Sequence, residues 1–127
     1  MNRVTALVFS AVLLTFVGCA TPVTREQITS ADYGKFPSTY KESIQGYMSN
    51  VLIDPESGRY RFFEKPVKGY AYINGTLSPP EFGYLVFAGI NAKNRYGGYT
   101  GEKAHIFFFR DDKFYDITSG TKWERVE

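Results

Sequence analysis

The segment at residues 82–109 constrains the fold more than any other part of the sequence. It reads FGYLVFAGINAKNRYGGYTGEKAHIFFF, two apolar runs joined by a connection rich in glycine, aromatic and basic residues. Each run alternates between two faces with the period of a β-strand, and the first run is apolar on both faces, as in a central strand. The glycines of the connection tolerate the positive φ angles at which a chain reverses. This segment therefore predicts a long antiparallel β-hairpin with an elaborate tip.

An amphipathic helix is predicted before the hairpin, beginning at Thr39. Thr39 and Glu42 have the spacing of a capping box. Apolar residues then recur on one helical face: Tyr40, Ile44, Tyr47, Met48, Val51 and Leu52. Gly46 weakens the helix by up to about 1 kcal/mol relative to alanine. Pro55 ends it, because the residue before a proline avoids the α region.

Shorter β-strands are predicted at residues 59–64, 68–73 and 114–118. Lys65-Pro66, between the first two, is suited to a sheet edge or a bend. This order of elements predicts an α+β fold in which one amphipathic N-terminal helix packs on a four- to five-stranded antiparallel β-meander. With a single helix, the sheet either curls around it or leaves one face open. An open face would expose aromatic residues as a partner site, namely Tyr60, Phe62, Tyr70 or Tyr72.

The N-terminal residues 1–18 have the organisation of a bacterial signal peptide. Arg3 supplies a positive charge, and the uncharged, mostly apolar run at 4–17 is too short to span a bilayer comfortably. Cys19 follows directly and is the only cysteine of the chain. A disulfide framework within the chain is therefore excluded.

The quartet Phe16-Val17-Gly18-Cys19 resembles a bacterial lipobox, with phenylalanine in place of the usual leucine at its first position. The resemblance implies a diacylglycerol thioether on Cys19, cleavage before it, and a third acyl chain on the new amino group. Two or more acyl chains hold a protein firmly on a membrane, whereas one holds it weakly. Ala20 is not the aspartate that often retains such proteins in the inner membrane, so the periplasmic face of the outer membrane is expected. The alternative is an ordinary secretory signal with a coincidental cysteine.

The mature chain is expected to have two parts. Residues 19–31 comprise the lipidated cysteine and a flexible polar tether, since they show no apolar periodicity. Residues 32–127 form a single α+β domain, the size of which suits one hydrophobic core. Near its end, Trp123 either pins the C-terminus to the domain or lies in a mobile tail.

The mature domain also resembles small envelope lipoproteins of Gram-negative bacteria. The resemblance rests on Asp54-Pro55-x-Ser57, on Lys68-Gly69-Tyr70 and on the segment INAKNRYGGYTG at 90–101, and it covers most of residues 32–118. It implies no activity, cofactor or catalytic residue. Cys19 is thus the only functional residue that a resemblance supplies.

The connection at residues 91–101 is the best candidate binding site, because it combines aromatic anchors with adaptable polar groups on a glycine-rich loop. We predict that a partner contacts Asn91, Lys93, Asn94, Arg95, Tyr96 and Tyr99. The alternative is local structure: the asparagines cap the turn through their side chains and the tyrosines fold back onto the sheet.

Catalytic and metal sites are not predicted. His105 is the only histidine, and a general base needs a carboxylate or nucleophile that the nearby sequence does not supply. Asp111, Asp112 and Asp116 lack the spacing of a calcium loop, and turn formation explains the first two. A chain with one histidine and one cysteine is also poorly equipped for structural zinc. We therefore expect no enzyme and no cofactor.

Together these features predict a lipid-anchored periplasmic binding or scaffold module of the cell envelope, with another envelope protein as partner. The net charge of +2 gives no basis for nucleic-acid binding. Two alternatives remain. One is a small periplasmic enzyme or ligand-binding protein that uses the 91–101 loop and His105, and the other is an inhibitor or protective protein directed against an exogenous enzyme.

Overall fold

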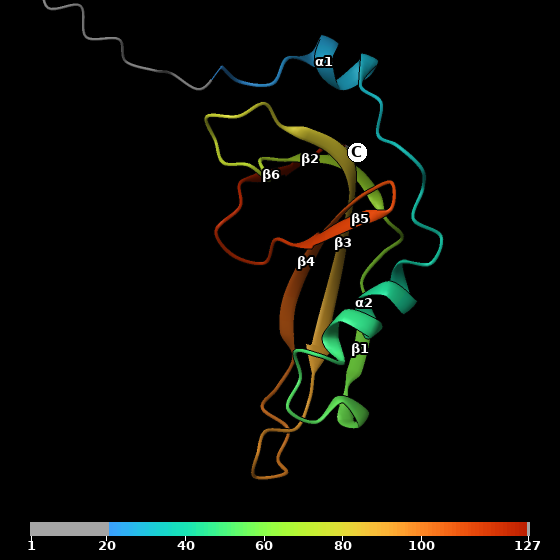
Figure 1. Ribbon diagram of the computed structural model, residues 1–127, viewed down its shortest axis with the longest axis vertical. Coiled ribbons are helices and arrows are strands. Elements are labelled where there is room, and N and C mark those ends of the chain that lie inside the picture. Colours follow the sequence, from blue (N-terminus) through green and yellow to red (C-terminus); the bar gives the residue numbers. More distant parts are fainter. Residues whose placement is uncertain (1–20, 127) are drawn as a thin grey trace, which may run out of the picture.

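The computed structural model describes residues 21–126. The predicted signal peptide and Cys19 lie outside this range. The fold is α+β, as predicted, with few helices and a mostly antiparallel sheet (Figure 1). The helices are α1 (Arg25–Ser30), α2 (Tyr40–Met48) and the 3-10 helix η1 (Pro55–Ser57). The strands are β1 (Arg59–Phe62), β2 (Val67–Ala71), β3 (Glu81–Asn91), β4 (Lys103–Arg110), β5 (Lys113–Asp116) and β6 (Trp123–Arg125).

Strand β3 is the centre of the sheet, and with β4 it forms the predicted long hairpin. The two strands pair in register from Tyr84↔Phe109 to Ile90↔Lys103. On its other edge β3 pairs with β2 through its first half and with β1 through its second half. The central position of this strand explains why the sequence is apolar on both of its faces.

Four consecutive strands, β2 to β5, pair antiparallel in sequence order as in the predicted β-meander, but β1 and β6 join the sheet outside that order. β1 and β2 run one after the other along the same edge of β3, and the segment at 63–66 between them contains the predicted bend at Lys65-Pro66. A sixth strand, β6, then pairs with β2, so that the order is β5-β4-β3-β2-β6. Trp123 begins this strand opposite Ala71, and its ring lies 5.5 Å from that of Phe87. Of the two alternatives, the C-terminal segment is therefore pinned to the sheet.

Helix α2 lies against one face of the sheet. Its residues Ile44 and Met48 are fully buried there, in one cluster with buried side chains of β3 and β4. The sheet residues of this cluster are Val86, Ala88, Ile90, Phe107 and Phe109. The stripe of apolar residues at helical spacing thus buries its centre, as an amphipathic helix requires.

Helix α2 ends at Met48, well before the proline at which the sequence predicted its end. The Ser49 hydroxyl and the Asn50 amide both donate to the carbonyl oxygen of Gly46, at 2.7 and 3.2 Å. Such side chains compete with the helical hydrogen bonds of the backbone. As a consequence Val51 is not on the buried stripe, and 53% of it is exposed.

The capping box is also found at a different helix. Within the described residues, the side chain of Thr39 makes no capping hydrogen bond. The reciprocal pair is instead Thr24 and Gln27, at the start of α1, inside the segment predicted to be a tether. Among the residues that the structure describes, no helix is long and apolar enough to cross a membrane.

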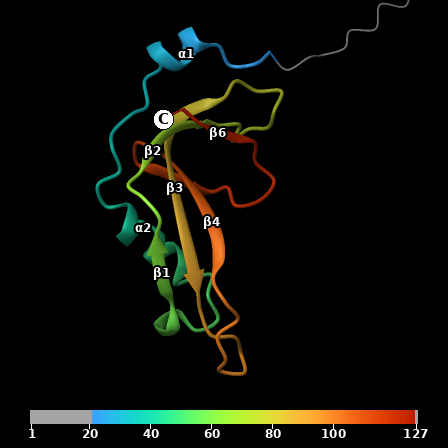
Figure 2. The ribbon, with the colours of Figure 1, turned by 180° about the vertical axis from the view of Figure 1, so that it is seen from behind.

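The second face of the sheet has its own core, formed by Ala71, Leu85, Phe108 and Ile117. Figure 2 shows β6 beside β2 at the end of the sheet far from the hairpin tip. Of the two alternatives, the open aromatic face is therefore not found for the four residues named above. Two of them, Tyr70 and Tyr72, are buried, and the other two pack partly buried against the α2 cluster.

Replacing Gly46 by alanine is expected to raise the free energy of unfolding by about 0.5–1 kcal/mol, because glycine is a poor residue inside a helix. Apart from the adjoining residues and the backbone of the helix itself, no atom of the described residues lies within 4 Å of the position that a Cβ would take there. Urea unfolding measures the change. Gly75→Ala is the control, since its φ of +89° disfavours alanine and predicts a loss of stability.

Candidate functional site

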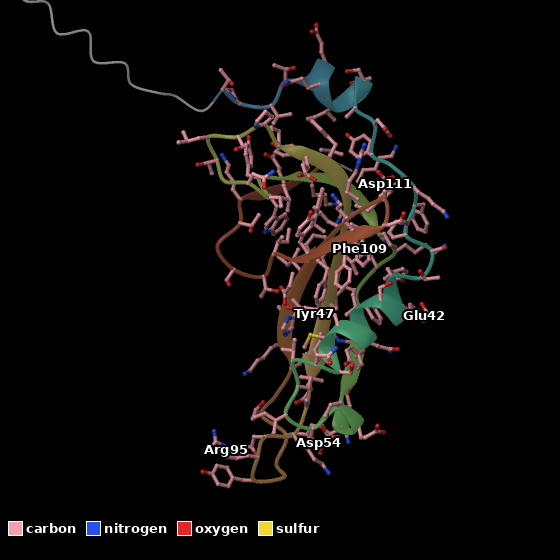
Figure 3. The ribbon with its side chains drawn as sticks, in the orientation of Figure 1. Glu42, Tyr47, Asp54, Arg95, Phe109 and Asp111 are labelled. Atoms are coloured by element: carbon pink, nitrogen blue, oxygen red, sulfur yellow. The ribbon has the colours of Figure 1, made fainter. Side chains whose placement is uncertain are left out.

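The connection between β3 and β4 projects from one end of the molecule. Helix α1 and the segment at 21–24 lie at the opposite end of its long axis (Figure 1). Arg95 lies on this connection, and Asp54, which precedes η1, lies beside it (Figure 3). We use the name tip loop for residues 92–102, the connection between the two strands.

Asn94 shapes the end of the tip loop. Its side-chain oxygen accepts hydrogen bonds from the backbone N–H groups of Tyr96 and Gly98, at 2.9 and 3.2 Å. Its backbone bonds to the same turn, donating to the Gly98 carbonyl and accepting from the N–H of Gly97, which has a φ of +80°. For Asn94, the alternative to partner binding is therefore confirmed, because its side chain caps a tight turn.

Tyr99 and Lys93 attach the loop to η1 through Ser57. The Tyr99 hydroxyl donates to the Ser57 carbonyl at 3.1 Å, and the Lys93 N–H donates to the Ser57 hydroxyl at 2.8 Å. That hydroxyl in turn donates to the carbonyl of Asp54 at 2.7 Å. The guanidinium of Arg59 lies 4.0 Å from the centre of the Tyr99 ring, a favourable cation–π distance. Ser57 was not among the predicted site residues, although it belongs to the Asp54-Pro55-x-Ser57 motif.

Ser57→Ala is expected to lower the free energy of unfolding by about 1–3 kcal/mol, because the Lys93 N–H loses its acceptor in a partly buried place. Urea unfolding gives the global effect, and amide hydrogen exchange gives the local opening of the tip loop. Ser78→Ala is the matched control, since the Ser78 hydroxyl donates to the Asn74 carbonyl at the surface. Equal losses in both variants would contradict the role of Ser57.

A second contact holds the base of the loop. Arg61 of β1 donates from Nε to Glu102 Oε2 at 3.0 Å, and its Nη2 contacts the other carboxylate oxygen. The hydrogen bond from Arg61 is the main reason why the pKa of the Glu102 carboxyl lies below its ordinary value. Both side chains are substantially exposed, so this ion pair orients the loop more than it stabilises the fold.

Arg95 and Tyr96 remain available for a partner. Both are exposed, and Tyr96 is 88% exposed. Asn91 lies at the end of β3, and its buried side-chain oxygen has no hydrogen-bond partner among the described residues. The six residues predicted to contact a partner therefore fall into three groups. Two of them form an exposed tip, three build and brace the loop, and Asn91 belongs to the sheet.

A cleft of about 290 Å³ lies at the base of the tip loop, under the segment that follows α2. Met48, Leu52 and Ile90 contribute apolar lining, and Ile53, 68% exposed, is at its opening. The described residues that line the cleft include two lysines, Lys93 and Lys103, and the histidine His105, but no aspartate or glutamate. The cleft therefore combines an apolar lining with positively charged lysine side chains.

His105 has a carboxylate partner that its neighbours in sequence do not supply. The β4–β5 pairing places His105 Nδ1 3.9 Å from Asp116 Oδ2, and its ring stacks on that of Phe107. The Thr118 hydroxyl lies 3.5 Å from His105 Nδ1, but it donates its hydrogen bond to Asp116 at 2.5 Å. His105 therefore does not accept the proton of this hydroxyl, as a general base acting on a nucleophile would. Within residues 21–126, no group of three or more histidine, cysteine, aspartate or glutamate residues is placed to hold a metal ion.

The Asp116 contact could have been found from the turn. A two-residue turn at Asp111-Asp112 pairs Arg110 with Lys113, and continuing that register brings the end of β5 beside His105.

No family model, curated protein or solved structure matches the chain.

Proposed function

We propose that this protein is a lipid-anchored periplasmic binding module of the cell envelope, which presents the tip loop to a protein partner. The anchor is the Cys19 lipobox of the sequence. The observation that carries the proposal is the placement of the two ends. Residues 21–24, the first that the structure describes after Cys19, lie at one end of the molecule, and the tip loop lies at the other (Figure 1).

The tip loop is suited to recognition because it is rigid and ends in an exposed aromatic ring. Asn94, Ser57 and Tyr99 already hold its backbone, so that binding orders few additional residues. Tyr96 is a residue type that often dominates the energy of protein interfaces. Helix α2 and the sheet, packed on each other through Ile44 and Met48, form the body that supports the loop.

The test is photo-crosslinking in cells, with a photoreactive residue in place of Tyr96 in the lipidated protein. The control carries the same residue in place of Leu77, which is 94% exposed and belongs to the β2–β3 loop at the other end of the molecule. We expect one envelope protein, identified by mass spectrometry, from position 96 and not from position 77. Capture of nothing, or of the same mixture at both positions, would overturn the proposal. Capture of an enzyme from outside the cell would support the inhibitor alternative.

A second candidate function is the binding of a small anion with an apolar tail in the cleft. The apolar lining and the positive side chains of the cleft favour such a ligand. A medium-chain fatty acid such as laurate is a suitable probe. We expect it to raise the melting temperature, and Lys103→Glu to remove this shift. The control Lys113→Glu, outside the cleft, would retain it. If laurate produces no shift with the parent protein, this candidate fails and the binding module is unaffected.

A further inference from the structure

The loop between β2 and β3 carries the most exposed large apolar side chain in the described part of the protein. This side chain is Leu77, which is 94% exposed. Turns on both sides hold it in place: the Gly75 N–H donates to the Tyr72 carbonyl, and Ser78 donates to Gly75 and Asn74. A single exposed apolar residue does not by itself mark an interaction surface, so its surroundings decide what it contacts.

This loop lies beside the start of the described chain. A cleft of about 540 Å³ is lined on one side by residues 21–24 and on the other by residues 76–80. Of the described residues that line it, none is charged, and Pro79 and Pro80 offer no backbone N–H group. The cleft beside Leu77 is therefore uncharged, with threonine and serine side chains among its apolar lining.

The position of Cys19 in the sequence determines what this surface faces. Thr21 lines the cleft and follows Cys19 by two residues, a separation that an extended chain spans with at most about 7 Å. The capping box of Thr24 and Gln27 then fixes the chain into α1. An acyl chain on Cys19 would therefore enter the bilayer close to Leu77.

We propose that the loop at residues 74–80 is a membrane-contact surface, which inserts Leu77 into the lipid interface beside the anchor. This inference rests on the proposed lipid anchor at Cys19. Burial of one leucine is too weak to hold a protein on a bilayer by itself. With the anchor in place, the contact becomes intramolecular and needs little further energy. It turns the opposite end of the molecule, with the tip loop, away from the membrane.

The test uses the full lipidated protein in vesicles of phosphatidylethanolamine and phosphatidylglycerol. Lipidation blocks Cys19, the only native cysteine, so that Leu77→Cys supplies a single thiol for an environment-sensitive fluorophore. Tyr96→Cys is the matched control, since both side chains are almost fully exposed but belong to loops at opposite ends of the molecule. We expect a blue-shifted emission and several-fold stronger quenching by a lipid-borne quencher at position 77 than at position 96.

The outcomes separate the two proposals. If the protein floats with the vesicles but the fluorophore at position 77 reports water, the membrane contact is overturned and the anchor remains. If the protein does not float, both the anchor and the membrane contact are overturned. Equal quenching at positions 77 and 96 would mean that the domain lies flat on the bilayer, which contradicts the inferred orientation.

Discussion

Phe107→Ala is expected to lower the free energy of unfolding by about 3–5 kcal/mol, the largest loss among the substitutions considered. Phe107 is fully buried at the centre of β4, where it packs in one cluster with Ile44 and Met48 of α2. The rings of Tyr47 and Phe114 lie 6.2 and 6.3 Å from it. Removing the ring leaves a cavity between the helix and the sheet that neither can close without moving.

Urea unfolding followed by circular dichroism measures this loss. Phe63→Ala is the control with the same change of side chain, since Phe63 is 46% exposed beside Arg61. Its loss should stay below about 1 kcal/mol. A comparable loss in the two variants would contradict the described packing of α2 on the sheet.

Gly83→Ala is expected to lower the free energy of unfolding by about 1–3 kcal/mol, with the loss toward the upper end of this range. A Cβ at this position would lie 2.3 Å from the backbone oxygen of Phe109 and 2.7 Å from the Phe108 ring. Neither neighbour is free to give way, because Phe108 is fully buried and the oxygen belongs to β4. The glycine is therefore required by close approach in the middle of the sheet.

The matched control is Gly98→Ala in the tip loop, where the nearest atom, Asn94 Oδ1, is 4.0 Å from the position of the added Cβ. Its backbone does not have a positive φ, so we expect a change of less than about 1 kcal/mol. Thermal and urea unfolding of both variants provide the comparison. If Gly83→Ala is as stable as Gly98→Ala, β3 and β4 are not packed as closely as described.

The predictions that succeeded depend on local patterns. The hairpin of β3 and β4 follows from alternation within each strand and from glycines that permit the reversal, such as Gly97 and Gly101 with their positive φ angles. The centre of α2 follows from apolar residues at helical spacing. Its end was misplaced because Ser49 and Asn50 bond back to Gly46, a competition that periodicity does not register.

The sequence singled out the tip loop as the candidate site, but the structural roles of the residues in this loop could not be assigned from it. Tyr96 and Tyr99 are three residues apart in the same glycine-rich loop. One is exposed, whereas the other donates a hydrogen bond to Ser57, 42 residues earlier. In the same way, Asp116 reaches His105 only through the pairing of β4 with β5.

The sequence by itself determined the α+β class and the long central hairpin, and it carries the lipobox-like quartet on which the proposed anchor rests. These features depend on residues that are close in sequence, because the period of the apolar residues predicts the strands and the helix, and the order of a few neighbouring residues defines the leader motif. Only the tertiary structure decided which loop residues are exposed, how β1 and β6 join the sheet, and that Leu77 and the tip loop lie at opposite ends. Each of these depends on contacts between distant parts of the chain, and their free energy is set by packing in three dimensions.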